Sequence, residues 1–249
     1  MQKKWLYLIP LSLIIIGCGG TENDTTTTNK GEGSIDLRTY LEKEDSSKNY
    51  QLNKKNTQNQ FYTEVTTVTS NKIERKIAGF TNTIINIEDK KLINIDVSDE
   101  GNINTSSYRH IDIGDTLFST DINSTKTLKV GTQEVGTEKT LGTNSCKLTE
   151  QLDKFSKGSN SYTGDIIKVK CTKATTITTK VKDEFVGTVN HINGTVDSID
   201  TSYYYQKKDI GLIAHINDDC IPTNMTYPDD STACSDEQKT YSYIYYLGN

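Results

Sequence analysis

The chain has little proline, methionine and tryptophan, and only a minority of its residues are hydrophobic. Its 249 residues include 3 Pro, 2 Met and 1 Trp, and 33% of them are hydrophobic. A membrane-spanning helix needs about 20 apolar residues, whereas the apolar stretch from Trp5 to Ile16 has 12 and is interrupted by Pro10. These shortages predict a protein without a transmembrane helix and a folded body with a thin hydrophobic core.

Basic residues are also in the minority, and they form no stripe along the chain. The 28 Lys and Arg residues against 33 Asp and Glu give a net charge of −5, and loss of a leader that contains Lys3 and Lys4 would make it about −7. A nucleic-acid-binding domain calls for a clustered basic face. We therefore expect no nucleic acid among the partners of this protein.

What the chain does have is a distinctive amino terminus. Lys3 and Lys4 precede the apolar stretch, which ends in Ile15-Ile16-Gly17-Cys18. A basic start and a short apolar core are typical of a signal peptide, and the last four residues resemble the bacterial lipobox. The resemblance implies cleavage before Cys18, attachment of fatty acyl chains such as palmitate to its thiol, and acylation of the new amino terminus.

Multiple acyl chains hold a protein firmly at a membrane. Gly19 stands where an Asp acts as a retention signal in lipoproteins of many Gram-negative bacteria. The resemblance therefore implies a place in the bacterial cell envelope, anchored in the outer membrane and facing the periplasm. Residues 19–33 carry no apolar side chain and cannot offset the entropy of ordering. We expect a signal peptide over 1–17, a lipidated flexible tether over 18–33 and one β-rich domain over 34–249.

Strand patterns dominate after residue 60. Ile or Val alternates with polar residues over 83–87 and 92–97, and the polar loop Glu88-Asp89-Lys90-Lys91 separates the two runs, which predicts a hairpin. A second hairpin is predicted over 202–215, around the polar residues 206–209. Successive hairpins favour an antiparallel meander. We expect a mainly β fold, with the meander forming a curved sheet, a half-barrel or a sandwich.

Two local signals add detail to this expectation. Asn193-Gly194 accepts the positive φ angles of a type I′ turn and predicts a hairpin between 184–192 and 195–199. The spacing of Leu148, Leu152 and Phe155 is helical, and it predicts at most one short helix.

Four cysteines lie beyond the leader: Cys146, Cys171, Cys220 and Cys234. Disulfides persist in exported proteins, and four cysteines allow three pairings. We expect Cys146–Cys171 and Cys220–Cys234, which close the shortest loops. A zinc site is the alternative, but the chain has no CxxC pair and no histidine beside a cysteine. We therefore predict no metal and no cofactor.

Evidence for catalysis is weak in the sequence. Alternation places His110 and Asp112 on one strand face, as a base with an orienting carboxylate would be. No serine lies in a nucleophile-elbow sequence, so we predict no catalytic residues and keep a hydrolase as a remote alternative. Asp121-Ile122-Asn123-Ser124-Thr125 matches the extended acidic sequon of bacterial N-glycosylation, which makes Asn123 a candidate glycosylation site.

The second half of the chain resembles a group of uncharacterised bacterial envelope lipoproteins. The matching stretches are 162–171, 203–213 and 217–220, the second of which reads Tyr-Tyr-Tyr-Gln-Lys-Lys-Asp-Ile-Gly-Leu-Ile. The resemblance implies a β-rich lipoprotein and brings no known activity with it. We expect a non-enzymatic binding or structural module whose protein or small-molecule partner the sequence does not name. The alternative is a periplasmic carrier that shelters an apolar ligand or lipid in a curved sheet.

Overall fold

The computed structural model describes residues 33–54, 60–77, 82–98, 101–157, 160–186, 193–220 and 239–246. The first half contains β1 (Ile35–Asp36), the 3-10 helix η1 (Leu37–Tyr40), β2 (Ser46–Lys54), β3 (Gln60–Val68), β4 (Lys72–Ile77), β5 (Asn82–Ile87), β6 (Lys91–Ser98), β7 (Gly101–Tyr108) and β8 (His110–Ile111). The second half contains β9 (Thr116–Val130), β10 (Gln133–Lys157), β11 (Asn160–Val181), η2 (Asp183–Phe185), β12 (Gly194–Lys207), β13 (Gly211–Cys220) and β14 (Lys239–Tyr246).

Twelve strands form one antiparallel sheet in the order β7-β6-β5-β4-β3-β2-β14-β13-β12-β11-β10-β9. The order consists of two meanders, β2 to β7 and β9 to β14, in which each strand pairs with its neighbour in the sequence. The two meanders join where β14 pairs with β2, with Tyr246 opposite Tyr50. The expected mainly β, antiparallel fold is confirmed.

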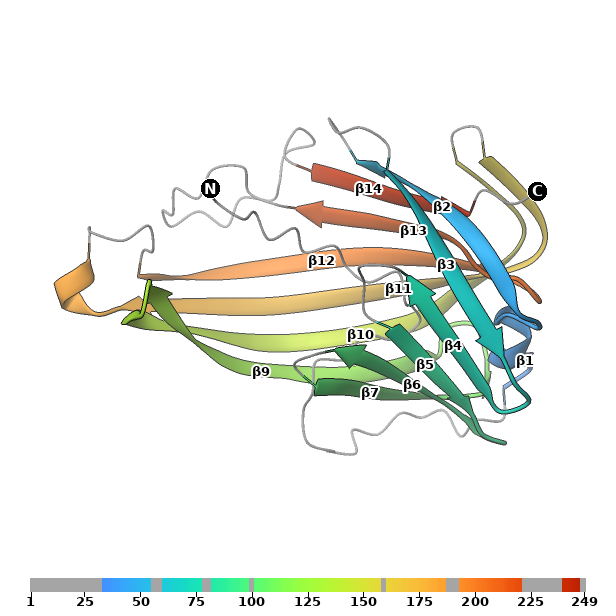
Figure 1. The fold of residues 1–249 in the computed structure, drawn as a ribbon, viewed down its shortest axis with the longest axis horizontal. Helices are drawn as coiled ribbons and strands as arrows, with labels where there is room; N and C mark the ends of the chain where they lie inside the picture. The colour runs from blue at the N-terminus through green and yellow to red at the C-terminus, as the bar shows by residue number, and fades with distance from the viewer. Residues whose placement is uncertain are drawn as a thin grey trace.

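The sheet curls until its two end strands, β7 and β9, come close to each other, but they do not pair, so it is not closed into a barrel. Figure 1 shows the short strands β3 to β7 crossing in front of the long strands of the second meander. Strands β9 to β12 continue past this crossing as a four-stranded extension, which we call the arm. The arm begins beyond the Cys146–Cys171 pair and ends at the turn formed by Gly131 and Thr132.

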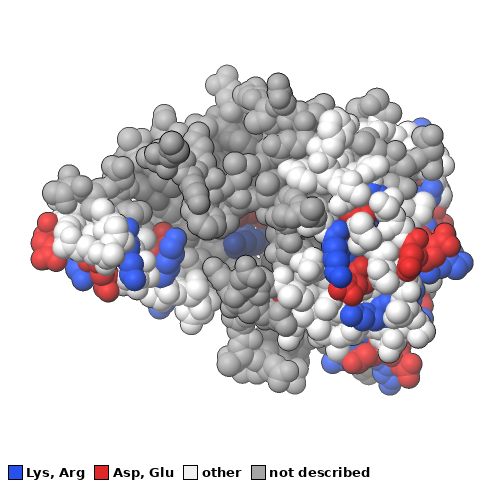
Figure 2. Space-filling model, viewed as in Figure 1, with Lys and Arg blue, Asp and Glu red and all other residues white. Residues whose placement is uncertain are grey.

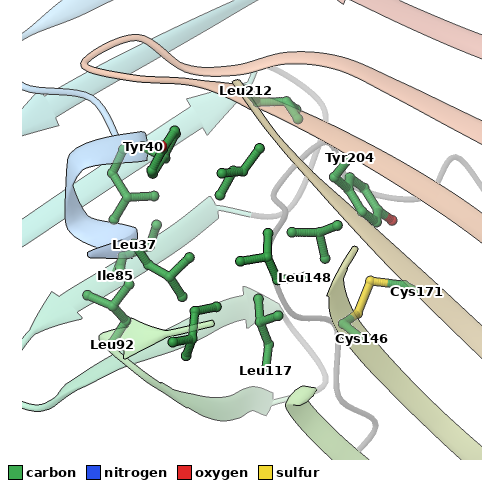
Figure 3. Packing of buried hydrophobic residues seen from close by; sticks show 14 of the residues in the cluster. Leu37, Tyr40, Ile85, Leu92, Leu117, Cys146, Leu148, Cys171, Tyr204 and Leu212 are labelled. Carbon is green, nitrogen blue, oxygen red and sulfur yellow. A yellow bond between two sulfur atoms is a disulfide. The ribbon is translucent and has the colours of Figure 1, made fainter. Parts of the chain in front are cut away.

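The concave side of the curl is filled by the segment that precedes β2. We call residues 34–42 the N-terminal plug. Leu37 and Leu41 of the plug are almost fully buried, and Figure 3 shows Leu37 and Tyr40 pointing toward apolar residues of the sheet. The cluster they join draws on both meanders and includes Ile85, Leu92, Leu117, Leu148, Tyr204 and Leu212. Burial of this plug holds the two halves of the curled sheet around one core.

A second, smaller apolar cluster lies on the opposite face of the sheet. Phe155 and Tyr162 pair across β10 and β11, and the Phe155 ring stacks on Tyr205 with 3.9 Å between centroids. Tyr204 belongs to the inner cluster while Tyr205 belongs to the outer one, as strand alternation requires. Consecutive tyrosines therefore support packing on two faces rather than one aromatic platform.

The helix predicted around Leu148 is wrong, because residues 148–155 lie inside strand β10. The ladder between β10 and β11 changes register twice, between Leu148 and Glu150 and between Leu152 and Lys154. A bulge breaks the two-residue alternation of a strand. Leu148 then belongs to the inner cluster while Leu152 and Phe155 pack in the outer one. Two bulges thus imitate a helical spacing in the sequence.

The hairpin predicted at Asn193-Gly194 is also wrong. Residues 183–185 form η2, and Gly194 pairs with Thr179 of β11. Among the described residues only Asp209 and four glycines, Gly114, Gly131, Gly164 and Gly211, have a positive φ, so the Asn-Gly pair forms no type I′ turn. The other two hairpins are confirmed, since β5 pairs with β6 and β12 pairs with β13.

Candidate functional site

The plug is fastened to the 109–112 segment by a set of polar contacts. Asp36 accepts two hydrogen bonds from the Arg109 guanidinium, at 2.8 and 2.7 Å, and also caps η1 by accepting from the backbone N–H of Arg38. Ser34 donates from its backbone N–H and its hydroxyl to Asp112, at 2.9 and 2.8 Å. Bidentate pairs of this kind fix geometry as well as charge. The first residues after the predicted tether are therefore fixed to the 109–112 segment of the folded body.

These contacts place His110 differently from the sequence expectation. The Asp112 carboxylate is engaged by Ser34, whereas His110 Nε2 lies 3.8 Å from the Asp36 carboxylate and Asp36 pairs with His110 across β1 and β8. Burial would raise the pKa of Asp36, but the Arg109 hydrogen bond and the Arg38 backbone contact outweigh it and lower the pKa. Asp36 and Asp112 therefore help to hold the plug against the sheet, through Arg109 and Ser34.

A cluster of buried charges lies where the plug meets the sheet. Glu42, the last plug residue, accepts from Lys48 of β2 at 2.5 Å and from Arg75 of β4 at 2.6 Å. All three side chains are at most 4% exposed. Gly211 lies against the Glu42 carboxylate so closely that a β-carbon there would collide with it. A charge buried this deeply is stable only with such partners.

Two more groups complete the cluster. Tyr50 of β2 donates to the backbone carbonyl of Leu212 at 3.1 Å and contacts Glu64 of β3 at 3.3 Å. Lys48 also donates to the backbone carbonyl of Ile210. The cluster thus ties the plug to both meanders, through β2 and β4 on one side and the β12–β13 turn on the other.

This cluster was not predicted from the sequence. One local feature of the sequence points to it. Alternation along the strand places Arg75 on the same face as Ile73 and Ile77, which are buried. A charge in the apolar phase of a strand indicates a buried partner. The partner, Glu42, lies 33 residues away in a segment without strand pattern.

Electrostatics differ between the two buried glutamates. Burial would raise the pKa of Glu42, but the charges of Arg75 and Lys48 outweigh it and lower the pKa to about 2. Burial raises the pKa of Glu64, and the neighbouring Glu42 charge adds to this effect. Burial and both carboxylates also raise the pKa of Tyr50 well above its usual range. The cluster therefore holds the pKa of one carboxyl, Glu42, below its usual value and the pKa of the other, Glu64, above it.

We predict a pH-dependent contribution to stability from Glu42. A carboxyl with a lowered folded-state pKa stabilises the protein above its unfolded-state pKa of about 4.5, and this contribution disappears as the pH falls toward about 2. The difference in unfolding free energy between the wild type and Glu42→Gln should therefore be large at pH 7 and shrink between pH 4.5 and 2, in urea titrations.

Glu64→Gln supplies the contrast. Because its folded-state pKa is raised, ionised Glu64 costs stability at neutral pH, so this variant should be as stable as the wild type at pH 7 or more stable. A Glu42→Gln difference that stays constant down to pH 2 would contradict the account of the cluster.

The inner face beside the cluster is polar as well as apolar. Thr66, Arg75, Thr83 and Asp96 face one another across β3 to β6, and all are buried. Thr83 donates its hydroxyl to Asp96 at 3.0 Å. Asn94, Thr105 and Ser107 continue this polar area across β6 and β7. The concave face of the first meander therefore carries no continuous apolar lining.

The predicted Cys146–Cys171 disulfide is present. The two residues lie directly opposite each other in the β10–β11 ladder and are 1% and 8% exposed. Cys220 is the last residue of β13, with its backbone opposite Lys239 of β14. Cys18 and Cys234 lie outside the described residues, so lipid attachment and the Cys220–Cys234 bridge stay predictions.

Asn123 lies in the middle of β9, opposite Leu141, and its side chain is exposed. It stays a candidate glycosylation site. His215 is buried and stacks on Tyr204 with 4.2 Å between ring centroids, within the inner core. His191 lies outside the described residues. The described part of the chain groups no three Cys, His, Asp or Glu side chains as metal ligands.

On the face that Figure 2 shows, the described residues form no large area of one charge sign. In Figure 2, Lys and Arg side chains are interspersed with Asp and Glu at both ends of the molecule. The part of the chain that the structure describes also holds no helix with the length and apolar character to cross a membrane. Comparisons with protein-family models, with curated proteins and with solved structures find no match to this chain.

Proposed function

We propose that this chain is a lipid-anchored cell-envelope protein, attached to the outer membrane through Cys18 and acting as a non-enzymatic binding or structural module. The leader sequence supports the anchor, and the Cys146–Cys171 disulfide fits an exported protein. In this proposal the tether of residues 18–33 joins the lipid to the plug, and the group of uncharacterised envelope lipoproteins stays the family it resembles.

The observation that carries the proposal is how the plug is held. The first described residues after the tether are fixed by the Ser34–Asp112 and Asp36–Arg109 contacts and, at the other end of the plug, by buried Glu42. The residues that suggested a hydrolase lie within this attachment, where Asp112 accepts from Ser34 and His110 lies 3.8 Å from the Asp36 carboxylate. A domain whose folded part begins directly after a flexible tether stays near the membrane, within the reach of residues 18–33, which suits a module that presents a surface.

Substitution of the lipidated residue tests the anchor. Full-length Cys18→Ser should appear in the soluble fraction of lysed cells, whereas the wild type should sediment with membranes and be released only by detergent, because each acyl chain adds about 0.8 kcal/mol of membrane affinity per buried methylene. Cys220→Ser is the matched control and should still sediment. Membrane association of Cys18→Ser equal to that of the wild type would refute the anchor.

A second candidate function is carriage of an apolar ligand. The curl of the sheet and the approach of β7 to β9 favour it, since such curvature encloses a concave face. The plug and the buried polar area over β3 to β6 argue for the module instead. Native mass spectrometry of detergent-released protein separates the two: the module should carry no lipid beyond its own anchor, and a stoichiometric additional lipid would favour the carrier.

A further inference from the structure

Strand β9 is the last strand of the sheet, and its outer edge faces no other described strand along the arm. β7 comes close to β9, but Figure 1 shows β9 continuing beyond β7 toward Val130. The ladder between β9 and β10 has two register shifts. The extra residue lies on β10 in one and is Leu117 of β9 in the other, so β9 has no bulge from Phe118 to Val130. An edge of this length that no described strand pairs with offers backbone hydrogen bonds to another strand.

We propose that this edge pairs with β9 of a second copy of the chain. Two identical strands join antiparallel around a two-fold axis normal to the sheet. That symmetry leaves each face of the sheet on the same side, so even-numbered residues lie opposite even-numbered ones and odd opposite odd. If residue k lies on the axis, the numbers of any two residues that lie opposite each other add up to 2k. We propose the register in which Thr125 lies opposite Thr125 of the second copy.

Charge complementarity selects this register. Asp121 and Lys129 lie on one face of β9, and both are exposed. Within the chain they lie opposite Thr143 and Glu134 of β10, and neither forms an ion pair with another described residue. With Thr125 on the axis, Asp121 lies opposite Lys129 of the second copy, and the symmetry makes this contact twice. Opposite charges directly across a ladder stabilise the pairing of strands.

The other face of β9 agrees with the same register. Ile122 lies opposite Leu128 of the second copy, which joins two apolar residues, and Lys126 lies opposite Ser124. Shifting the axis to Lys126 places two lysines opposite each other, and shifting it to Ser124 places Lys126 opposite Ile122. Among axes from Asn123 to Thr127, only Thr125 brings Asp121 and Lys129 together.

The proposal predicts which single cysteine cross-links. Full-length Thr125→Cys places two cysteines opposite each other, about 4.5–5.5 Å apart between Cα atoms, which is within reach of a disulfide. Thr127→Cys is the matched control, because Thr127 lies opposite Asn123 and its symmetry mate is four residues, or roughly 13 Å, away along the strand. After mild oxidation of detergent-released protein, a non-reducing gel should show most of Thr125→Cys, and little of Thr127→Cys, as a covalent dimer.

Reversal of the charges tests the same contact without cysteines. Asp121→Lys creates two Lys–Lys contacts in the homodimer, and Lys129→Asp creates two Asp–Asp contacts, so each variant alone should be mainly monomeric. Mixing the two restores both Lys–Asp contacts in a heterodimer. Light scattering or native mass spectrometry should show the dimer population fall several-fold in each variant and return in the mixture.

Each other outcome overturns the proposal. A wild type that is monomeric at all attainable concentrations, equal cross-linking of the two cysteine variants, or charge variants that remain dimeric would each contradict it. Normal unfolding curves for the variants establish that a lost dimer reflects the edge and not a damaged fold. The test does not depend on the lipid anchor, because Cys18→Ser protein should give the same cross-linking pattern in detergent-free buffer.

Discussion

Replacing Glu42 with alanine is expected to lower the free energy of unfolding by about 3–5 kcal/mol, the range for breaking a buried ion pair by removing one partner. The substitution leaves the Lys48 ammonium and the Arg75 guanidinium buried beneath the plug without the carboxylate that contacts both. Chemical denaturation at pH 7, followed by circular dichroism, measures the change.

Glu150→Ala is the matched control for this prediction. Glu150 accepts from Lys168 at 2.7 Å, a distance similar to those in the buried cluster, but its side chain is 47% exposed. Exposed ion pairs contribute at most about 1 kcal/mol, so this variant should remain close to the wild type. If the two variants lose equal stability, burial of the Glu42 cluster is not what makes it important.

Removing the Cys146–Cys171 bridge is expected to cost roughly 3–4 kcal/mol. The two cysteines are 25 residues apart, and a loop of that size gives this value in the chain-entropy model. The double variant Cys146→Ala with Cys171→Ala should therefore unfold at a clearly lower concentration of guanidinium chloride than the wild type.

A variant that lacks Cys220 and Cys234 isolates the effect of the Cys146–Cys171 bridge. In Cys220→Ala with Cys234→Ala protein, reductant acts on the Cys146–Cys171 bridge alone, because Cys18 carries no disulfide in the proposed anchor. Addition of reductant should reproduce the loss seen in the Cys146/Cys171 variant. Unfolding that is indifferent to reductant in this background would contradict a stabilising bridge.

Local patterns in the sequence predicted local structure well. The alternation over 83–87 and 92–97 corresponds to β5 and β6, which pair as expected. The nearest-neighbour pairing of cysteines predicted Cys146–Cys171, since adjacent strands of a hairpin bring such residues opposite each other. Both predictions rest on residues that are close in sequence, where the period of two and the length of the loop decide the outcome.

Local patterns failed where the ladder itself changes. The spacing of Leu148, Leu152 and Phe155 reads as a helix only because the β10–β11 ladder contains two register shifts. Asn193-Gly194 is a strong turn signal, but Gly194 starts a strand that pairs with β11. In both cases the long β11 strand provides hydrogen bonds over most of its length, and these outweigh the preference of a few residues.

Sequence patterns suffice to predict the class of structure, which includes antiparallel strands, the hairpins with regular alternation and the shortest disulfide. The pairing of β14 with β2, the filling of the concave face by the plug and the position of Glu42 between Lys48 and Arg75 depend on the tertiary fold. The physical reason is sequence distance. Alternation reports which face of a strand is buried, whereas the partner of a buried charge is set by how the whole sheet curls.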